Sequence, residues 1–333
     1  MKKLFLFALC VCCCWSCSTF IPGFVPEKKG QLIDEQAFQE ADQYFWDQFH
    51  AGHYDSIPKV LEYLKRVYVQ HPNDYRIAAH IGFAHSWALA ESDRLESVPA
   101  SITDHATLST KYFEEAFQMH PEKEWRYYGF LTSMTIAEGS IHHDNKEVTR
   151  AYFQLKKSAR KYPEFNLFTA AYTLAMSPRK QDRDKALTML LQNLNKCLGE
   201  KIDLLAFNVN DHWSKIELDG KMSTCWNSWI APHNLEGFLM ILGDLLVRNG
   251  DLEAAANIYE NVTRIPEYQT WTFKPQLEDR LDRTQQAINI SANLEIGTFL
   301  GYDRCMVCHQ EKTLTPSPED VHQRIPLSAT SLY

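Results

Sequence analysis

The chain has little glycine, little proline and no excess of positive charge. Thirteen Gly and 14 Pro among 333 residues are too few for a low-complexity protein. There are 34 basic residues against 42 acidic ones, and that balance argues against nucleic acid as a partner. The sequence also lacks a nucleophile elbow, a phosphate-binding loop and an HExxH zinc motif. We therefore expect neither a nucleic-acid-binding protein nor an enzyme.

Apolar residues are plentiful, and one run of them stands at the N-terminus. Hydrophobic residues make up 45% of the chain and aromatic residues 12%, enough to bury a sizeable core. Two lysines precede the apolar run at residues 4–15. That run has the length of a signal-peptide core and is too short to span a bilayer. Ser16-Cys17 ends it, and a polar stretch follows.

Ser16-Cys17 resembles the lipobox of bacterial lipoproteins, in which the cysteine is acylated and becomes the mature N-terminus. The resemblance implies a signal peptide over residues 1–16, a lipid anchor on Cys17 and a tether through residue 33. In the family's sorting pattern, a residue other than Asp directly after the cysteine favours the outer membrane. Ser18 stands at that position, so the resemblance implies an outer-membrane protein that faces the periplasm. Several acyl chains anchor a protein stably, since each buried CH₂ is worth about 0.8 kcal/mol. The alternative is an ordinary secretory signal peptide.

The clearest folding pattern lies in residues 235–266. Apolar residues recur at helical spacing up to Asn249, and Gly250 suits a helix C-terminus because glycine tolerates the left-handed conformation. Asp251 can then cap a second helix. We predict further helices throughout residues 34–290. They cover residues 34–51, 56–71, 75–92, 107–120, 125–138, 146–162, 165–176, 183–194 and 268–288.

The helix pair at residues 235–266 resembles a tetratricopeptide (TPR) unit. The residues that carry the resemblance are Gly243, Gly250-Asp251, Ala254-Ala255, Tyr259 and Pro266. One helix pair cannot bury its apolar face alone. The resemblance therefore implies an all-α fold, a TPR-like α-solenoid of antiparallel helix pairs over residues 34–290.

The helical pattern lapses at residues 197–232, which we predict to be an irregular insertion packed on the solenoid. Cys197 and Cys225 flank this insertion. A disulfide between them would close a loop of roughly thirty residues and contribute on the order of 3 kcal/mol. The alternative is two buried thiols in separate helices.

A CxxCH motif stands in the C-terminal segment, residues 291–333. Cys305, Cys308 and His309 resemble a c-type haem attachment site, in which two thiols bond to the porphyrin and the histidine ligates iron. A distal ligand would be His322 or a methionine. Two other states stay open: a disulfide or unmodified thiols, and zinc held by these residues together with His322. We expect the tail from Thr313 onward to be flexible.

The favoured function is a non-catalytic protein–protein interaction scaffold in the bacterial envelope. The lipid would attach the chain to the membrane, and the solenoid would bind a protein partner. The TPR resemblance supports only this generic statement, because a fold does not define its partner. One alternative is a single-haem electron-transfer protein that uses the CxxCH motif. A second alternative is a ligand-binding component of a periplasmic transport system, with a cleft near Trp213 and Trp226.

Overall fold

The computed structural model describes residues 28–177, 179–212, 226–290 and 305–311. Within these ranges every regular element is helical, so the all-α prediction is confirmed, whereas the TPR-like arrangement stays a prediction. The same ranges contain no helix that is both long and apolar enough to cross a membrane. The α-helices are α2 (Glu35–His50), α3 (Ile57–Gln70), α4 (Tyr75–Ala90), α5 (Ile102–Met119), α6 (Trp125–Ile141), α7 (Asn145–Lys161), α8 (Pro163–Ala175), α9 (Lys180–Leu198), α10 (Asn234–Asn249), α11 (Leu252–Val262), α12 (Lys274–Ile290) and α13 (Met306–His309). Short 3₁₀ helices are η1 (Tyr54–Ser56), η2 (Ser92–Arg94), η3 (Val209–Asp211) and η6 (Pro266–Gln269).

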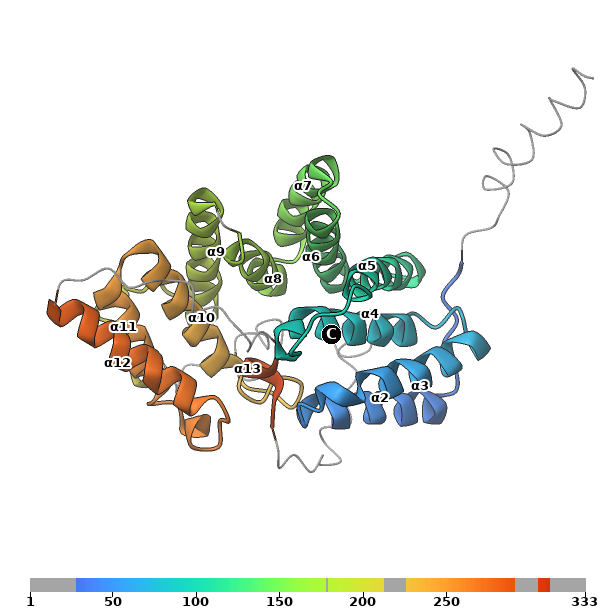
Figure 1. Ribbon diagram of the computed structural model, residues 1–333, viewed down its shortest axis with the longest axis horizontal. Helices are drawn as coiled ribbons and strands as arrows, with labels where there is room; N and C mark the ends of the chain where they lie inside the picture. Colours follow the sequence, from blue (N-terminus) through green and yellow to red (C-terminus); the bar gives the residue numbers. More distant parts are fainter. Residues whose placement is uncertain (1–27, 178, 213–225, 291–304, 312–333) are drawn as a thin grey trace, which may run out of the picture.

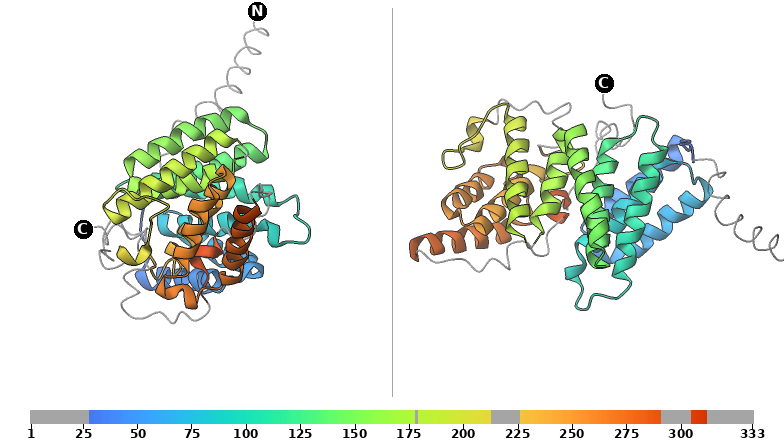
Figure 2. Two further views of the ribbon diagram at one scale, coloured as in Figure 1. Left: turned by 90° about the vertical axis from the view of Figure 1, so that its left-hand side faces the viewer. Right: turned by 90° about the horizontal axis from the view of Figure 1, so that it is seen from above.

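The helices form a curved array in which each helix packs mainly against its neighbours along the chain (Figure 1). The N-terminal helices α2–α4 lie at one end of the array and α10–α12 at the other. Figure 2 shows the same array from two further sides. The one-turn helix α13 lies between the two ends, where it contacts α10 and α2. Residues near the C-terminus of the chain therefore contact both α2 and α10.

Local capping residues define several helix ends. The Asp34 side chain accepts hydrogen bonds from the first backbone N–H groups of α2, and Asp144 does the same for α7. Gly250 ends α10 in the left-handed conformation, with φ +87°, as its position after Asn249 predicts. Asp251 then caps α11 by accepting a hydrogen bond from Ala254 N. These ends agree with the sequence pattern.

Several predicted boundaries differ from the structure; for example, α9 spans Lys180–Leu198 where residues 183–194 were predicted. Helix α5 begins at Ile102, well before the predicted residue 107, and Ser101 at its start makes no side-chain capping bond. The helix predicted for residues 268–288 is divided into η6 and α12. Pro266 opens η6 and does not close α11, because its fixed φ suits the first position of a helix.

Close packing joins the last three long helices. A side chain at Gly243 would overlap the ring of Tyr259, so the absence of a Cβ lets α10 and α11 approach each other. The Tyr259 hydroxyl donates to Asp244 Oδ1 at 2.6 Å, and Arg280 of α12 donates to the same oxygen at 2.9 Å. Asp244 and Tyr259 are almost fully buried. This network fixes the C-terminal end of the array.

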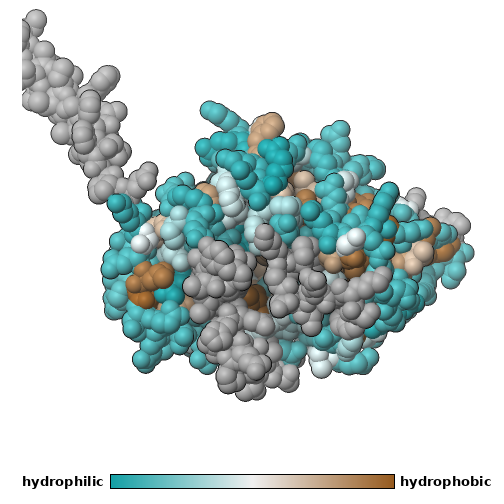
Figure 3. Space-filling view, turned by 180° about the vertical axis from the view of Figure 1, so that it is seen from behind, coloured by the Kyte–Doolittle hydropathy of each residue, from teal (hydrophilic) through white to brown (hydrophobic). Residues whose placement is uncertain are grey.

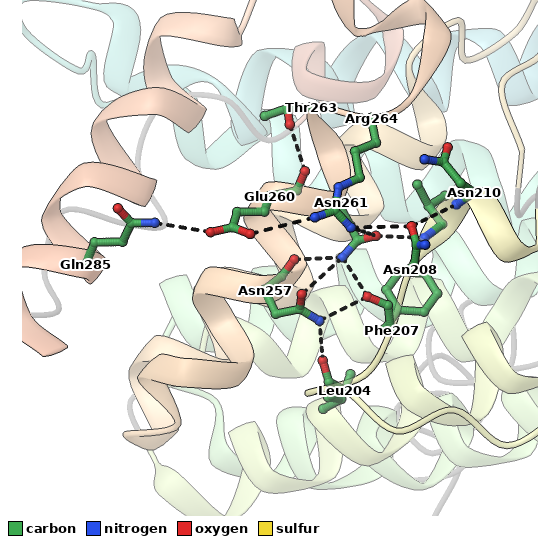
Figure 4. Close-up of polar contacts among 11 residues, drawn as sticks. Leu204, Phe207, Asn208, Asn210, Asn257, Glu260, Asn261, Thr263, Arg264 and Gln285 are labelled. Carbon is green, nitrogen blue, oxygen red and sulfur yellow. Dashed lines mark hydrogen bonds and ion pairs between the residues drawn. The ribbon is translucent and has the colours of Figure 1, made fainter.

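The described part of the predicted insertion contains η3 but no long helix. Two asparagines of α11 hold it to the array (Figure 4). Asn257 donates to Leu204 O and Phe207 O, while Asn261 donates to Phe207 O and accepts from Val209 N at 2.7 Å. Side-chain amides thus satisfy main-chain groups that lack a helical partner.

Candidate functional site

Residues 305–311, called the docked segment here, pack between the two ends of the array, and the residues that surround them are called the groove. The segment contains α13, and its Met306, Val307 and Cys308 side chains are buried. The groove is formed by the end of α2, the residue after α4, the loop before α10, α10 itself and the loop before α12. The CxxCH motif is therefore part of the main core.

The N-terminal end of the docked segment is bound by Glu91. Glu91 Oε1 accepts hydrogen bonds from Cys305 N at 3.1 Å and from Met306 N at 2.9 Å. Arg94 Nε lies 2.7 Å from the other carboxylate oxygen. The first N–H groups of a helix have no partner within it, so a carboxylate is a favourable acceptor there. Glu91, directly after α4, supplies that acceptor from a distant part of the chain.

Other main-chain groups of the segment are bound by the C-terminal half of the array and by α2. Trp271 Nε1 donates to Val307 O at 2.8 Å, and His233 N donates to Cys308 O at 3.0 Å. Glu311 N donates to the carbonyl of His50, the last residue of α2, at 2.8 Å. The groove therefore recognises mainly the backbone of the segment.

A buried histidine adds a charged contact. His233 lies between two carboxylates, with Glu236 Oε1 3.1 Å from Nδ1 and Glu311 Oε2 3.1 Å from Nε2. Burial alone lowers the pKa of His233, but the hydrogen bonds and charges of Glu236 and Glu311 outweigh it and raise that pKa. When it is protonated, His233 bridges the two acids and ties Glu311 of the segment to the start of α10.

His309 is oriented by a backbone carbonyl. Its Nδ1 lies 2.7 Å from Ile230 O and must carry the proton, because a carbonyl oxygen only accepts. The ring packs on Phe49 with centroids 5.0 Å apart. His50 Nε2 donates to the same carbonyl at 3.1 Å. Burial lowers the pKa of His309 to about 4, so the imidazole is neutral at pH 7.

Cys308 faces the backbone of α10. A side chain at Gly237 would overlap the Cys308 sulfur, which shows how closely the two elements approach. Burial, with the charge of Glu236, raises the pKa of the Cys308 thiol to about 12. This cysteine is therefore a protonated packing group and a poor nucleophile at neutral pH. Cys305 and Cys308 are both thiols.

The groove does not fit a haem group with the segment in this position. Nδ1 of the neutral His309 ring carries the proton, because it donates to Ile230 O. Nε2 is therefore unprotonated, as an iron ligand must be. A porphyrin bonded to Cys308 would, however, have to occupy the place of α10 around Gly237. Haem attachment therefore stays an alternative that the packing of Cys308 against α10 disfavours.

The remaining predicted site residues are placed only in part. Cys17, Cys225 and His322 lie outside the described residues. Cys197 is disulfide-bonded, but its pairing with Cys225 stays a prediction. Among the described residues no group of three or more His, Cys, Asp or Glu side chains is arranged to hold a metal ion.

The tryptophans of the insertion do not line an open cleft in the described part of the chain. Trp226 and Trp229 are both buried. Trp229 packs edge-on against Trp46 and His50 of α2, with ring centroids 5.5 and 4.8 Å apart. Trp213 lies outside the described residues. The two described tryptophans therefore belong to the core beside the docked segment.

Sequence reasoning singled out the CxxCH motif but missed the residues that bind it. Glu91, His233 and Trp271 carry no motif that links them to Cys305. Glu91 is 214 positions from Cys305, and no periodic pattern reports a contact over that separation.

Searches against protein-family models, curated proteins and solved structures found no match. The proposal of a function therefore depends on the geometry of the groove.

Proposed function

We propose that this chain is a lipoprotein of the bacterial cell envelope whose helical array is a non-catalytic scaffold for a partner protein. The anchor would be Cys17, and the array would be a TPR-like solenoid. The groove would bind a short helical segment of the partner in the way that it binds residues 305–311. The observation that supports the proposal is this docked segment, a short helical piece of chain held mainly through its backbone.

The contacts define the chemistry of a suitable partner segment. Most hydrogen bonds reach main-chain groups, so they do not restrict the sequence of the occupant. Specificity would come from the sites of Met306 and Val307, which are buried, and from His233, which binds Glu311. The expected motif is an apolar pair followed, about one helical turn later, by an acidic residue.

A peptide-binding measurement tests the groove. Met306→Asp would place an uncompensated charge at a fully buried position, so the chain's own segment should leave the groove. A fluorescent peptide of residues 303–313 should then bind this variant saturably and bind the parent chain much more weakly. The matched control is the same peptide carrying Met306→Asp, which should not bind.

Absence of peptide binding to a variant that keeps its helical circular dichroism would contradict the proposal. Glu311→Lys is a second route to displacement, since it replaces the carboxylate that pairs with His233 by a cation. The lipid anchor has a separate test. Cys17→Ala should abolish acyl labelling and release the chain from membranes, and unchanged labelling would show that another residue carries the lipid.

A further inference from the structure

The outer face of α7 carries a row of basic side chains around one exposed aromatic ring. Phe153 is 64% exposed, although it belongs to a helix whose Ala151 and Leu155 are fully buried. The exposed positions recur every three or four residues, so they form one line along the helix. We call this line the basic stripe; its members are Lys146, Arg150, Phe153, Lys157, Arg160 and Lys161.

The charge of α7 is opposite to that of the chain. The helix has six basic residues and one acidic residue, whereas the whole chain has 34 basic and 42 acidic residues. At the N-terminal half of the helix, Glu147 pairs with Arg150 and Asp144 caps the first turn. Beyond the C-terminal end, Glu164 lies in the first turn of α8. Residues 156–161 contain four basic residues and no acidic one.

Helix stability accounts for only part of this charge. Cations in the last turn interact favourably with the helix dipole, and this explains Arg160 and Lys161. It does not explain the basic residues one turn earlier or the exposure of Phe153. A surface that holds positive charge around a lone apolar ring is complementary to an anionic partner with an apolar layer beneath its charge.

The lysines lie over aromatic rings that continue the stripe onto neighbouring helices. Lys157 Nζ is 5.9 Å from the centroid of Trp125 on α6, and Lys161 Nζ is 5.8 Å from the same ring. Lys156 Nζ lies 4.4 Å from the centroid of the Tyr152 ring, and Lys185 Nζ of α9 lies 5.3 Å from the same centroid. Aromatic rings beside flexible cations are typical of proteins at the headgroup level of membranes.

We propose that the basic stripe binds the anionic phospholipid surface of a membrane. Helix α7 lies at the outer edge of the array (Figure 1), and its exposed residues other than Phe153 are polar. The face of the molecule that Figure 3 shows is largely hydrophilic. An anionic layer with apolar chains beneath it suits both the cations and the exposed Phe153 ring, whereas an acidic protein segment would pair with the cations alone. The proposal does not rest on the peptide groove, which lies on other helices. A Cys17 anchor would hold the stripe near such a surface.

Vesicle binding tests the proposal with a chain that begins at Ser18. This chain keeps every described residue and cannot carry the predicted anchor or signal peptide. It should bind vesicles that contain phosphatidylglycerol, should bind pure phosphatidylcholine vesicles weakly, and should dissociate as salt is raised. Equal binding to the two kinds of vesicle, or no binding to either, would overturn the proposal.

Two variants and a matched control locate the binding face. Lys157→Glu, Arg160→Glu and Lys161→Glu together should lower partitioning onto the anionic vesicles about 100-fold. Phe153→Ala should lower it about tenfold without any change of charge. The control reverses three exposed lysines on other elements, Lys29, Lys59 and Lys111, and so has the same net charge as the triple variant. The control should stay within about threefold of the parent, and an equal loss in both triple variants would refute a localised stripe.

Discussion

Replacing Gly237 by alanine tests whether the docked segment depends on close contact with α10. A methyl group there would overlap the Cys308 sulfur and press on Val307. Extra atoms in a packed core cost about 1–3 kcal/mol, while alanine in place of glycine inside a helix stabilises by about 1 kcal/mol. We therefore expect Gly237→Ala to lower the free energy of unfolding by up to about 2 kcal/mol.

The second substitution removes the atom that the methyl group would strike. Cys308→Ala alone should cost about 1 kcal/mol, because it deletes one buried heavy atom. In the double variant the new methyl group occupies the space that the sulfur left. The double variant should therefore be more stable than the sum of the two single changes predicts, by about 1–2 kcal/mol.

Urea unfolding followed by circular dichroism measures these free energies. Gly129→Ala provides the matched control, because a side chain at this helical glycine would overlap the Asn166 side chain in another part of the array. Gly129→Ala should also lower the free energy of unfolding, and adding Cys308→Ala should not restore the loss that Gly129→Ala causes. If the effects of Gly237→Ala and Cys308→Ala add to within about 0.5 kcal/mol, as expected for distant sites, the proposed packing of the CxxCH segment is refuted.

Three further predictions concern the same groove. The pKa of His309 is lowered in the folded state to about 4, so the unfolded chain binds more protons below the ordinary pKa of 6.5. The contribution of His309 to stability should therefore be complete above pH 6.5 and be lost as the pH drops to 4, by about 3 kcal/mol as an upper limit. Unfolding curves measured across this pH range should show a smaller loss for His309→Gln. Glu91→Gln should weaken the cap on the segment by about 1 kcal/mol and speed hydrogen exchange at the Cys305 and Met306 amides, and unchanged exchange would contradict the cap. The protein from a host that attaches haem c should be colourless, because the Cys308 sulfur lies against α10; a Soret band with the mass of one haem would favour the electron-transfer alternative.

Helix positions were predictable where short-range chemistry decides them. The ends at Asp34, Gly250 and Asp251 depend on a capping side chain or a left-handed glycine, and both signals are visible within a few residues. The start of α5 was predicted too late because Ser101 makes no capping bond and the first turn has no marked apolar period. A helix end held by packing leaves little local signal in the sequence.

The groove could be predicted only in part, because its parts are far apart in the chain. The CxxCH spacing identified Cys305, Cys308 and His309 as a unit, and the structure keeps them together on α13. The sequence leaves three states open for that unit: haem attachment, a disulfide or unmodified thiols, and zinc binding. The sequence contains no pattern that predicts binding of its main chain by Glu91 and Trp271.

The short length of α13 explains why its partners matter more than its own sequence. A one-turn helix cannot persist alone, since fixing its first turn costs more than its hydrogen bonds return. Its N–H groups need Glu91 from the N-terminal half of the array, and its C=O groups need Trp271 and His233 from the C-terminal half. The segment therefore becomes helical only when both halves are in place around it. Any partner segment that replaces it must satisfy the same two halves, so occupancy of the groove and the arrangement of the array are linked.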